Sequence, residues 1–102
     1  MTYRTTQADL DRWSHRLNQV TGSPAERFKK GHGDGPDSWR LISNAGHYYI
    51  CQGNGGYKLA RIGNEGGGDS DVFEHGRRYT KRELVWLISA FVKGFELGRD
   101  NA

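Results

Sequence analysis

The sequence predicts a single α+β domain: a three- to four-stranded antiparallel meander sheet packed with an N-terminal and a C-terminal helix. Segments with the apolar spacing of amphipathic helices lie near both ends of the chain. Between them, three short segments rich in strand-forming residues are separated by turn sequences. A length of 102 residues corresponds to one domain, so we treat residues 1–102 as a single unit.

The first helix is predicted over residues 6–20. Thr6 followed by Asp9 is a typical helix start, and Gly22 followed by Pro24 is a typical stop. The apolar stripe of this helix consists of Leu10, Trp13, Leu17 and Val20.

A second, short helix is predicted to begin immediately afterwards. Ser23 is suited to the cap, Pro24 to the first helical position and Glu26 to the third. Phe28 would be its apolar anchor, and Gly31 would end it. Residues 31–37 then read as a flexible polar loop.

Strands are predicted over residues 38–43, 47–51 and 57–62, with a short fourth strand at Val72-Phe73 after a glycine-rich loop. Asn54-Gly55 predicts a type I′ hairpin turn between the second and third strands. Residues 44–46 fit a three-residue hairpin loop between the first and second strands.

These two turns define a register, and the register defines two faces of the sheet. The 44–46 loop would pair Ile42 with Tyr48, Leu41 with Tyr49, and Trp39 with Cys51. We assign one face to the core, against the last helix; its residues are Trp39, Leu41, Tyr49, Cys51, Ala60 and Ile62, with Lys58 at its edge. The other face is covered by the first helix or is a contact surface; it carries Arg40, Ile42, Tyr48, Ile50, Tyr57, Leu59 and Arg61.

The last helix is predicted to begin after Thr80, where Glu83 completes a capping box and Tyr79 with Leu84 forms a hydrophobic staple. Gly98 is its predicted end. Its core face carries Leu84, Ile88, Phe91, Val92 and Phe95. Its back carries Trp86, Ala90, Lys93 and Leu97, which are covered by the first helix or by another molecule.

Positive charge surrounds the start of this helix, at Arg77, Arg78, Lys81 and Arg82. Cations at that end oppose the helix dipole, so a sequence shaped for stability alone would carry acids there. One interpretation is an anion site in which the cations and free helix N–H groups hold a phosphate. The other is a solvated basic turn that pairs with Glu74 and Glu83.

No arrangement of residues predicts an enzyme, a metal site or a cofactor. Residues 63–68 are glycine-rich but lack the Gly-Lys-Ser/Thr end of a P-loop. His32, Asp34 and Asp37 share a loop without the spacing of metal ligands, and we interpret them as a polar connector.

The chain has the features of a soluble cytoplasmic protein. Cys51 is its only cysteine, so it cannot form an internal disulfide, and we expect an inert, buried thiol. The first residues lack the apolar stretch of a signal peptide, and no run of residues is apolar enough to cross a membrane.

Three segments resemble small accessory proteins encoded by phages and prophages: residues 55–59 (Gly-Gly-Tyr-Lys-Leu), Asn64 with Gly66-Gly67, and residues 80–84 (Thr-Lys-Arg-Glu-Leu). The resemblance covers roughly the second half of the chain. It implies an accessory role in an infected bacterial cell and implies nothing about catalytic residues.

The element order is also similar to that of double-stranded RNA-binding domains, with Gly35-Pro36-Asp37 ahead of a strand and basic residues opening the last helix. The chain departs from that family at Ser38, where the family has His, and it lacks the small-residue run of the family's last helix.

The leading hypothesis is therefore a non-enzymatic, phage-type factor that docks on a bacterial protein and modulates or inhibits it, including a defence component; a homodimer is compatible with it. Its candidate surfaces carry Arg40, Tyr48, Tyr57, Arg61, Trp86 and Leu97. The alternatives are a nucleic-acid-binding module, or a nucleotide-phosphate binder, at the start of the last helix.

Overall fold

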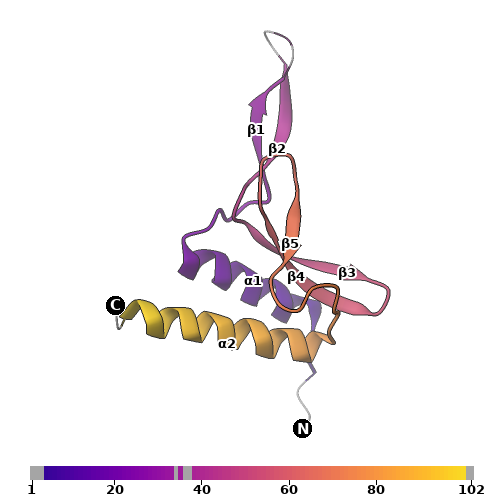
Figure 1. Ribbon diagram of the computed structural model, residues 1–102, viewed down its shortest axis with the longest axis vertical. Coiled ribbons are helices and arrows are strands. Elements are labelled where there is room, and N and C mark those ends of the chain that lie inside the picture. Colours follow the sequence, from indigo (N-terminus) through magenta and orange to yellow (C-terminus); the bar gives the residue numbers. More distant parts are fainter. Residues whose placement is uncertain (1–3, 34, 36–37, 101–102) are drawn as a thin grey trace.

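The computed structural model describes residues 4–33, 35 and 38–100. It confirms the α+β class. Its elements are α1 (Gln7–Thr21), β1 (Phe28–His32), β2 (Trp39–Ser43), β3 (Tyr48–Gly53), β4 (Gly56–Ile62), β5 (Asp69–Asp71) and α2 (Lys81–Asp100). The two helices lie side by side, β3, β4 and β5 form a sheet next to them, and β1 and β2 project as a narrow arm (Figure 1). Neither helix in the described part of the chain is long and apolar enough to span a membrane.

The first helix begins and ends where its capping residues predict. Asp9 N donates to Thr6 Oγ1 at 3.3 Å, and Thr6 N donates to Asp9 Oδ2 at 2.8 Å, which completes a capping box. Gly22 adopts the left-handed conformation, with φ of 70°, and its N–H bonds back to the last turn of the helix.

The last helix has the same kind of start. Glu83 N donates to Thr80 Oγ1 at 3.1 Å, and Thr80 N donates to Glu83 Oε1 at 3.0 Å. Tyr79 and Leu84, predicted as a staple, are both buried in the core. The predicted end at Gly98 is wrong, because α2 continues to Asp100. A glycine inside a helix costs only about 0.5–1 kcal/mol, which one position does not turn into a stop.

The sheet of β3, β4 and β5 has the predicted hairpin register, in which Tyr48 pairs with Arg61 and Ile50 with Leu59. The turn type differs from the expected type I′. Gly55 has φ of +91°, but no described residue other than glycine has a positive φ, so Asn54 does not. A negative φ followed by a positive one is the pattern of a type II turn.

The short last strand lies at Asp69–Asp71 rather than at Val72-Phe73. It pairs with the far end of β4, from Ala60 to Ile62. Val72 N still donates to Leu59 O at 3.0 Å, so the ladder continues one residue beyond the strand.

The predicted short helix after Ser23 is wrong, because its anchor Phe28 starts strand β1, which pairs with β2. Asn44 fixes this start by donating from its backbone N to Arg27 O at 2.9 Å and from Nδ2 to Glu26 O at 2.8 Å. A one-turn helix with one apolar anchor is costly to nucleate, whereas the strand gains a full ladder. The predicted loop of residues 31–37 therefore begins inside β1; residues 34, 36 and 37 lie outside the described part.

The predicted hairpin over residues 44–46 is also wrong, since β2 pairs with β1 and not with β3. The pairings expected for Ile42, Leu41 and Trp39 with β3 do not form. Residues 44–46 instead lead from the arm into the sheet, where Gly46 N donates to Ile62 O at 2.7 Å.

The assignment of faces is wrong for the residues of β2, whereas the predicted cover of the Tyr48 face by the first helix is confirmed. The core consists of Leu10, Leu17, Val20, Tyr48, Leu59, Tyr79, Leu84, Ile88 and Val92. Tyr48 and Leu59, on the face predicted to be covered by the first helix or to form a contact surface, are 7% and 1% exposed. Trp39 and Leu41, predicted to lie in the core, are 60% and 61% exposed. Ala60 and Ile62 are buried as expected, and Cys51 is only half-buried.

Candidate functional site

One face of the projecting arm is apolar and open to solvent. In the β1–β2 register, Phe28 lies opposite Ser43, Lys30 opposite Leu41, and His32 opposite Trp39. Residues directly opposite in an antiparallel pair point to the same face, so these side chains share one surface. We call it the ribbon face and define it by Phe28, Lys30, His32, Trp39 and Leu41.

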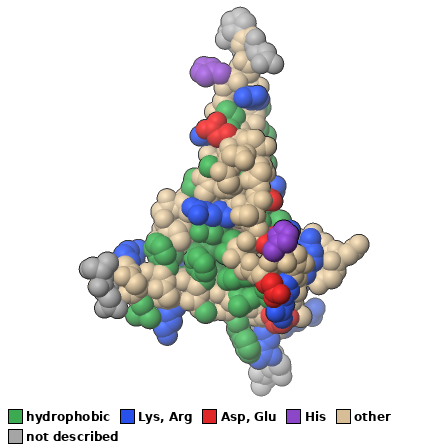
Figure 2. Space-filling view, viewed as in Figure 1, with side chains coloured by type: hydrophobic (Ala, Val, Ile, Leu, Met, Phe, Trp, Pro, Cys, Tyr) green, Lys and Arg blue, Asp and Glu red, His purple; other side chains and the backbone are tan. Residues whose placement is uncertain are grey.

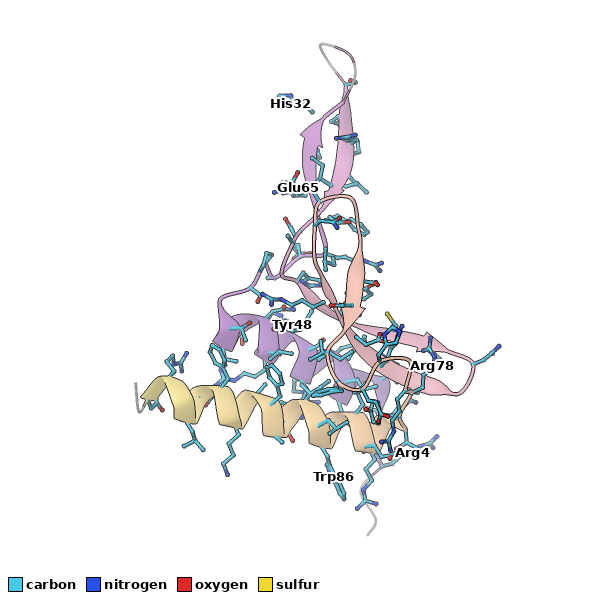
Figure 3. The ribbon with its side chains drawn as sticks, viewed as in Figure 1. Arg4, His32, Tyr48, Glu65, Arg78 and Trp86 are labelled. Atoms are coloured by element: carbon cyan, nitrogen blue, oxygen red, sulfur yellow. The ribbon has the colours of Figure 1, made fainter. Side chains whose placement is uncertain are left out.

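Three large apolar side chains of the ribbon face are exposed: Phe28 by 43%, Trp39 by 60% and Leu41 by 61%. Figure 2 shows the arm as a narrow column that stands out from the body, and Figure 3 shows His32 extending sideways near its far end. Among the described residues, neither helix packs extensively against either strand of the arm.

The reverse side of the arm carries Lys29, Ile42 and the exposed Arg40. Ile42 covers Gly31 so closely that a Cβ at that glycine would overlap the isoleucine side chain. Lys29 Nζ lies 3.5 Å from Glu65 Oε1, in the loop between β4 and β5. The two sides of the arm therefore differ in character: the reverse side has an ion pair to the body, whereas the ribbon face, which we call the open side, carries the three exposed apolar side chains.

Cations border the open side. Lys30 Nζ lies 5.1 Å from the centre of the Trp39 ring, and the Arg27 guanidinium lies 5.1 Å from that of Phe28. Lys30 has no ion pair within the part of the chain that the structure describes, whereas Arg40 pairs with Gly31 in the ladder and lies on the reverse side of the arm. An apolar centre with a cationic border suits a protein surface of apolar and acidic character.

The arm is anchored where it meets the sheet. His47 Nδ1 donates to Pro24 O at 2.8 Å, and its ring stacks on that of Tyr49 with an interplanar angle of 7°. The guanidinium group of Arg27 lies over the ring of Tyr49, 4.3 Å from its centre. The Tyr49 hydroxyl donates to Asp69, and burial together with this bond raises the pKa of Tyr49. These contacts fix the direction in which the arm leaves the body.

The predicted basic cluster exists as a corner at the start of α2, but its members have separate contacts. Arg77 pairs with Glu74 at 3.1 Å, as the solvated-turn interpretation predicts. Arg78 Nη1 donates to Gly56 O at 3.3 Å and lies against the β3–β4 turn. Lys81 lies 5.5 Å from the Tyr57 ring centre, and Arg82 lies 4.8 Å from that of Trp86.

The second predicted surface is not brought together. Tyr48 is buried, and Tyr57 is half-buried against the core. Arg61 lies 5.2 Å from the centre of the Tyr48 ring and covers it. Arg40 lies on β2, away from the other three, because β2 belongs to the arm.

The back of α2 is open. Trp86 is 61% exposed and Leu97 is 54% exposed, so the first helix does not cover them. Figure 3 shows Trp86 pointing away from the body of the molecule.

Comparison with models of known protein families, with curated proteins and with solved structures gave no significant match.

Sequence reasoning did not find the ribbon face. The sequence pattern predicts a helix at Phe28 and core positions for Trp39 and Leu41, whereas all three side chains lie exposed on the ribbon face. A usable signal was present in the turn residues Gly33, Gly35 and Pro36, which separate two segments that each carry an aromatic residue beside cations. That pattern is also typical of a β-hairpin.

Proposed function

We propose that this chain is a non-enzymatic binding protein that docks on another protein through the ribbon face. The observation that carries the proposal is the joint exposure of Trp39, Leu41 and Phe28 on one side of a projecting arm. Exposed apolar groups that cluster on one surface are typical of interaction sites. Tryptophan is also among the residue types that contribute most to binding energy.

The architecture of the arm supports the same proposal. A two-stranded ribbon is marginally stable by itself, and one face of this ribbon contacts no other element extensively. A partner seated on that face would bury the apolar side chains and order the arm. The body, by contrast, has an apolar core that joins both helices to the β3–β4 hairpin.

We place the partner in the cytoplasm of a bacterial host, in line with the resemblance of residues 55–59 and 80–84 to phage-encoded proteins. The chain would then be a phage-type accessory factor that modulates or inhibits a host protein, including a component of host defence.

A crosslinking experiment tests this proposal with a matched control in the same chain. A photoreactive phenylalanine is introduced at Trp39 or, as control, at Trp86, which is equally exposed on α2. Nuclease-treated bacterial lysate is irradiated with each variant, and proteins captured only from position 39 are purified. Their affinity for Trp39→Ala should fall by about 30-fold or more, the scale of a 2 kcal/mol hot spot. Trp86→Ala should bind like the parent; a loss confined to Trp86→Ala would contradict the proposal.

A second candidate function rests on the corner at the start of α2, where Lys81 lies over Tyr57 and Arg82 over Trp86. Cations beside aromatic rings are the composition of surfaces that bind single-stranded nucleic acid or a nucleotide phosphate. Titration of the full chain with oligonucleotides at several salt concentrations tests it. Binding that weakens steeply with salt, and is lost in a Lys81→Ala, Arg82→Ala variant, would support this candidate.

A further inference from the structure

The hydrogen bonds of the arm show which backbone groups of β1 point outward. Asn44 N donates to Arg27 O, and Gly33 N donates to Ser38 O, which marks the first and last hydrogen-bonded pairs of the ladder. Such pairs alternate with non-hydrogen-bonded pairs in an antiparallel ribbon. Lys29 and Gly31 therefore bond inward to β2. The N–H and C=O groups of Phe28, Lys30 and His32 point away from β2.

Several outward backbone groups on the other strands have partners, although those of Trp39 and Leu41 on β2 have none within the described part of the chain. The outward groups of Tyr48 on β3 bond to the side chain of Asn18, at 2.9 and 3.0 Å. Tyr57 on β4 exchanges two backbone hydrogen bonds with Tyr79, at 2.9 and 2.8 Å. On β2, Ser43 N donates to Glu65 O at 3.3 Å.

The outer edge of β1 has no such partner within the described part of the chain. Figure 1 shows β1 along the free side of the arm, with no other element drawn beside it. An unpaired strand edge is a template for the addition of another strand. The outward backbone groups of Phe28, Lys30 and His32 form a row that is long enough to pair with a short extended segment.

Charge decides which segment fits. β1 carries Lys29, Lys30 and His32 and no carboxylate, and Glu65 faces only Lys29. Pairing two copies of β1 would bring lysines of both copies together, which disfavours self-association. A segment with carboxylates would instead place them beside Lys30 and His32.

We infer that the outer edge of β1 accepts an extended, acidic segment of a partner protein as an additional strand. Main-chain hydrogen bonds would come from Phe28, Lys30 and His32, and selection for acidic residues would come from Lys30. This inference rests on the proposed function, because the added strand would extend the ribbon face that carries Trp39 and Leu41.

A peptide experiment on the full chain tests the inference without knowledge of the natural partner. The probes are a fluorescein-labelled octapeptide of alternating Glu and Val and its counterpart of alternating Lys and Val. The acidic peptide should bind at least ten-fold more tightly by fluorescence anisotropy. In amide exchange measured by NMR, it should protect Phe28, Lys30 and His32.

Two substitutions at Lys30 distinguish the contribution of its backbone N–H to peptide binding from the contribution of its charge. Lys30→Thr removes the ammonium group but keeps the N–H, whereas Lys30→Pro removes both, at an edge position where proline is tolerated. The acidic peptide should bind Lys30→Thr several-fold more weakly than the parent. It should bind Lys30→Pro at least ten-fold more weakly than Lys30→Thr. His32→Thr and His32→Pro repeat the comparison in case the first proline disturbs the arm, and the NMR spectrum of the body reports on folding.

Several results would overturn the inference. In the binding measurements, these results are equal affinities of the threonine and proline variants, equal binding of the two peptides, or no binding of the acidic peptide at millimolar concentration. In amide exchange, the contradicting result is protection of Trp39 and Leu41 on the β2 edge in place of Phe28, Lys30 and His32. Retained partner binding by Lys30→Pro together with its loss in Trp39→Ala would reject strand addition and leave docking through the ribbon face intact. Retained binding by Trp39→Ala would reject the proposed function itself.

Discussion

The β1–β2 arm and the β3–β4 hairpin have similar local chemistry and opposite surroundings. Both are antiparallel hairpins with aromatic side chains and cations placed over their rings. In the β3–β4 hairpin, Tyr48 and Leu59 pack against both helices, and β5 adds a third strand. In the arm, Trp39 and Leu41 remain exposed. The comparison indicates that the β3–β4 hairpin builds the core, whereas the arm leaves its large apolar side chains exposed.

The largest expected effect is a difference in stability loss between a buried leucine of the sheet and an exposed leucine of the arm. Leu59 on β4 is 1% exposed, and Leu41 on β2 is 61% exposed. Leu59→Ala should lower the free energy of unfolding by about 2–5 kcal/mol, because it leaves a cavity in the core. Leu41→Ala should change it by less than about 0.5 kcal/mol. Urea denaturation measures both; comparable losses would mean that the arm contributes to the core.

A glycine pair tests how tightly the β3–β4 hairpin is held at its turn. Gly56 has φ of +123°, and an added Cβ would lie 2.5 Å from the Tyr79 carbonyl oxygen. Gly76 also has a positive φ, of +76°, but an added Cβ would meet nothing within 4 Å. Gly56→Ala should therefore lower the free energy of unfolding by about 1–3 kcal/mol, because it strains the backbone and disturbs the backbone bridge to Tyr79. Gly76→Ala should cost less; the reverse order in denaturation midpoints would disprove this account of the turn.

The helix start that supports the β3–β4 hairpin should make a smaller contribution. Thr80→Ala removes the Oγ1 acceptor of the Glu83 N–H and should lower the free energy of unfolding by about 1 kcal/mol. Thr80→Ser keeps the acceptor and serves as the control. An unchanged denaturation midpoint for the alanine variant would show that the capping box is energetically silent.

Acid should weaken the same region through Asp71, which lies beside β4. A hydrogen bond from Gly76 N at 2.7 Å and the Lys58 ammonium at 3.0 Å lower the pKa of Asp71 below its usual 3.8. The stabilisation is fully present above the unfolded-state pKa and is lost as pH falls through the lower folded-state pKa. Denaturation midpoints between pH 5 and pH 2 should fall less steeply in Asp71→Asn than in the parent. The exposed Asp100→Asn control should follow the parent.

Local signals predicted the helices and one hairpin. Each capping box lies within four consecutive residues, and the Asn54-Gly55 turn fixes the β3–β4 register over a short span. These features depend on neighbours in the chain, so the sequence is sufficient to find them.

The arm could not be predicted in the same way. Ser23, Pro24 and Glu26 have the local chemistry of a helix start, but Phe28 joins a strand whose partner lies beyond residue 38. The choice depends on a ladder between distant segments, which overrides local propensity. Because Trp39 and Leu41 then lie outside the main sheet, the candidate site was mistaken for core.

The smallest expected effect on stability is at the residue proposed to matter most for binding. Trp39→Ala should change the free energy of unfolding by less than about 0.5 kcal/mol, because the indole is 60% exposed and supports no core contact. Backbone amides in the β1–β2 ladder, such as those of Lys29 and Gly31, should also exchange with solvent much faster than that of Ala60, which is buried and pairs with Tyr49 in the β3–β4 ladder. Amide exchange followed by NMR measures this directly in the parent protein. Equal protection in the arm and the sheet would show that the arm unfolds only with the body; fast exchange in the arm alone would show that it opens independently and is available to be ordered by a partner.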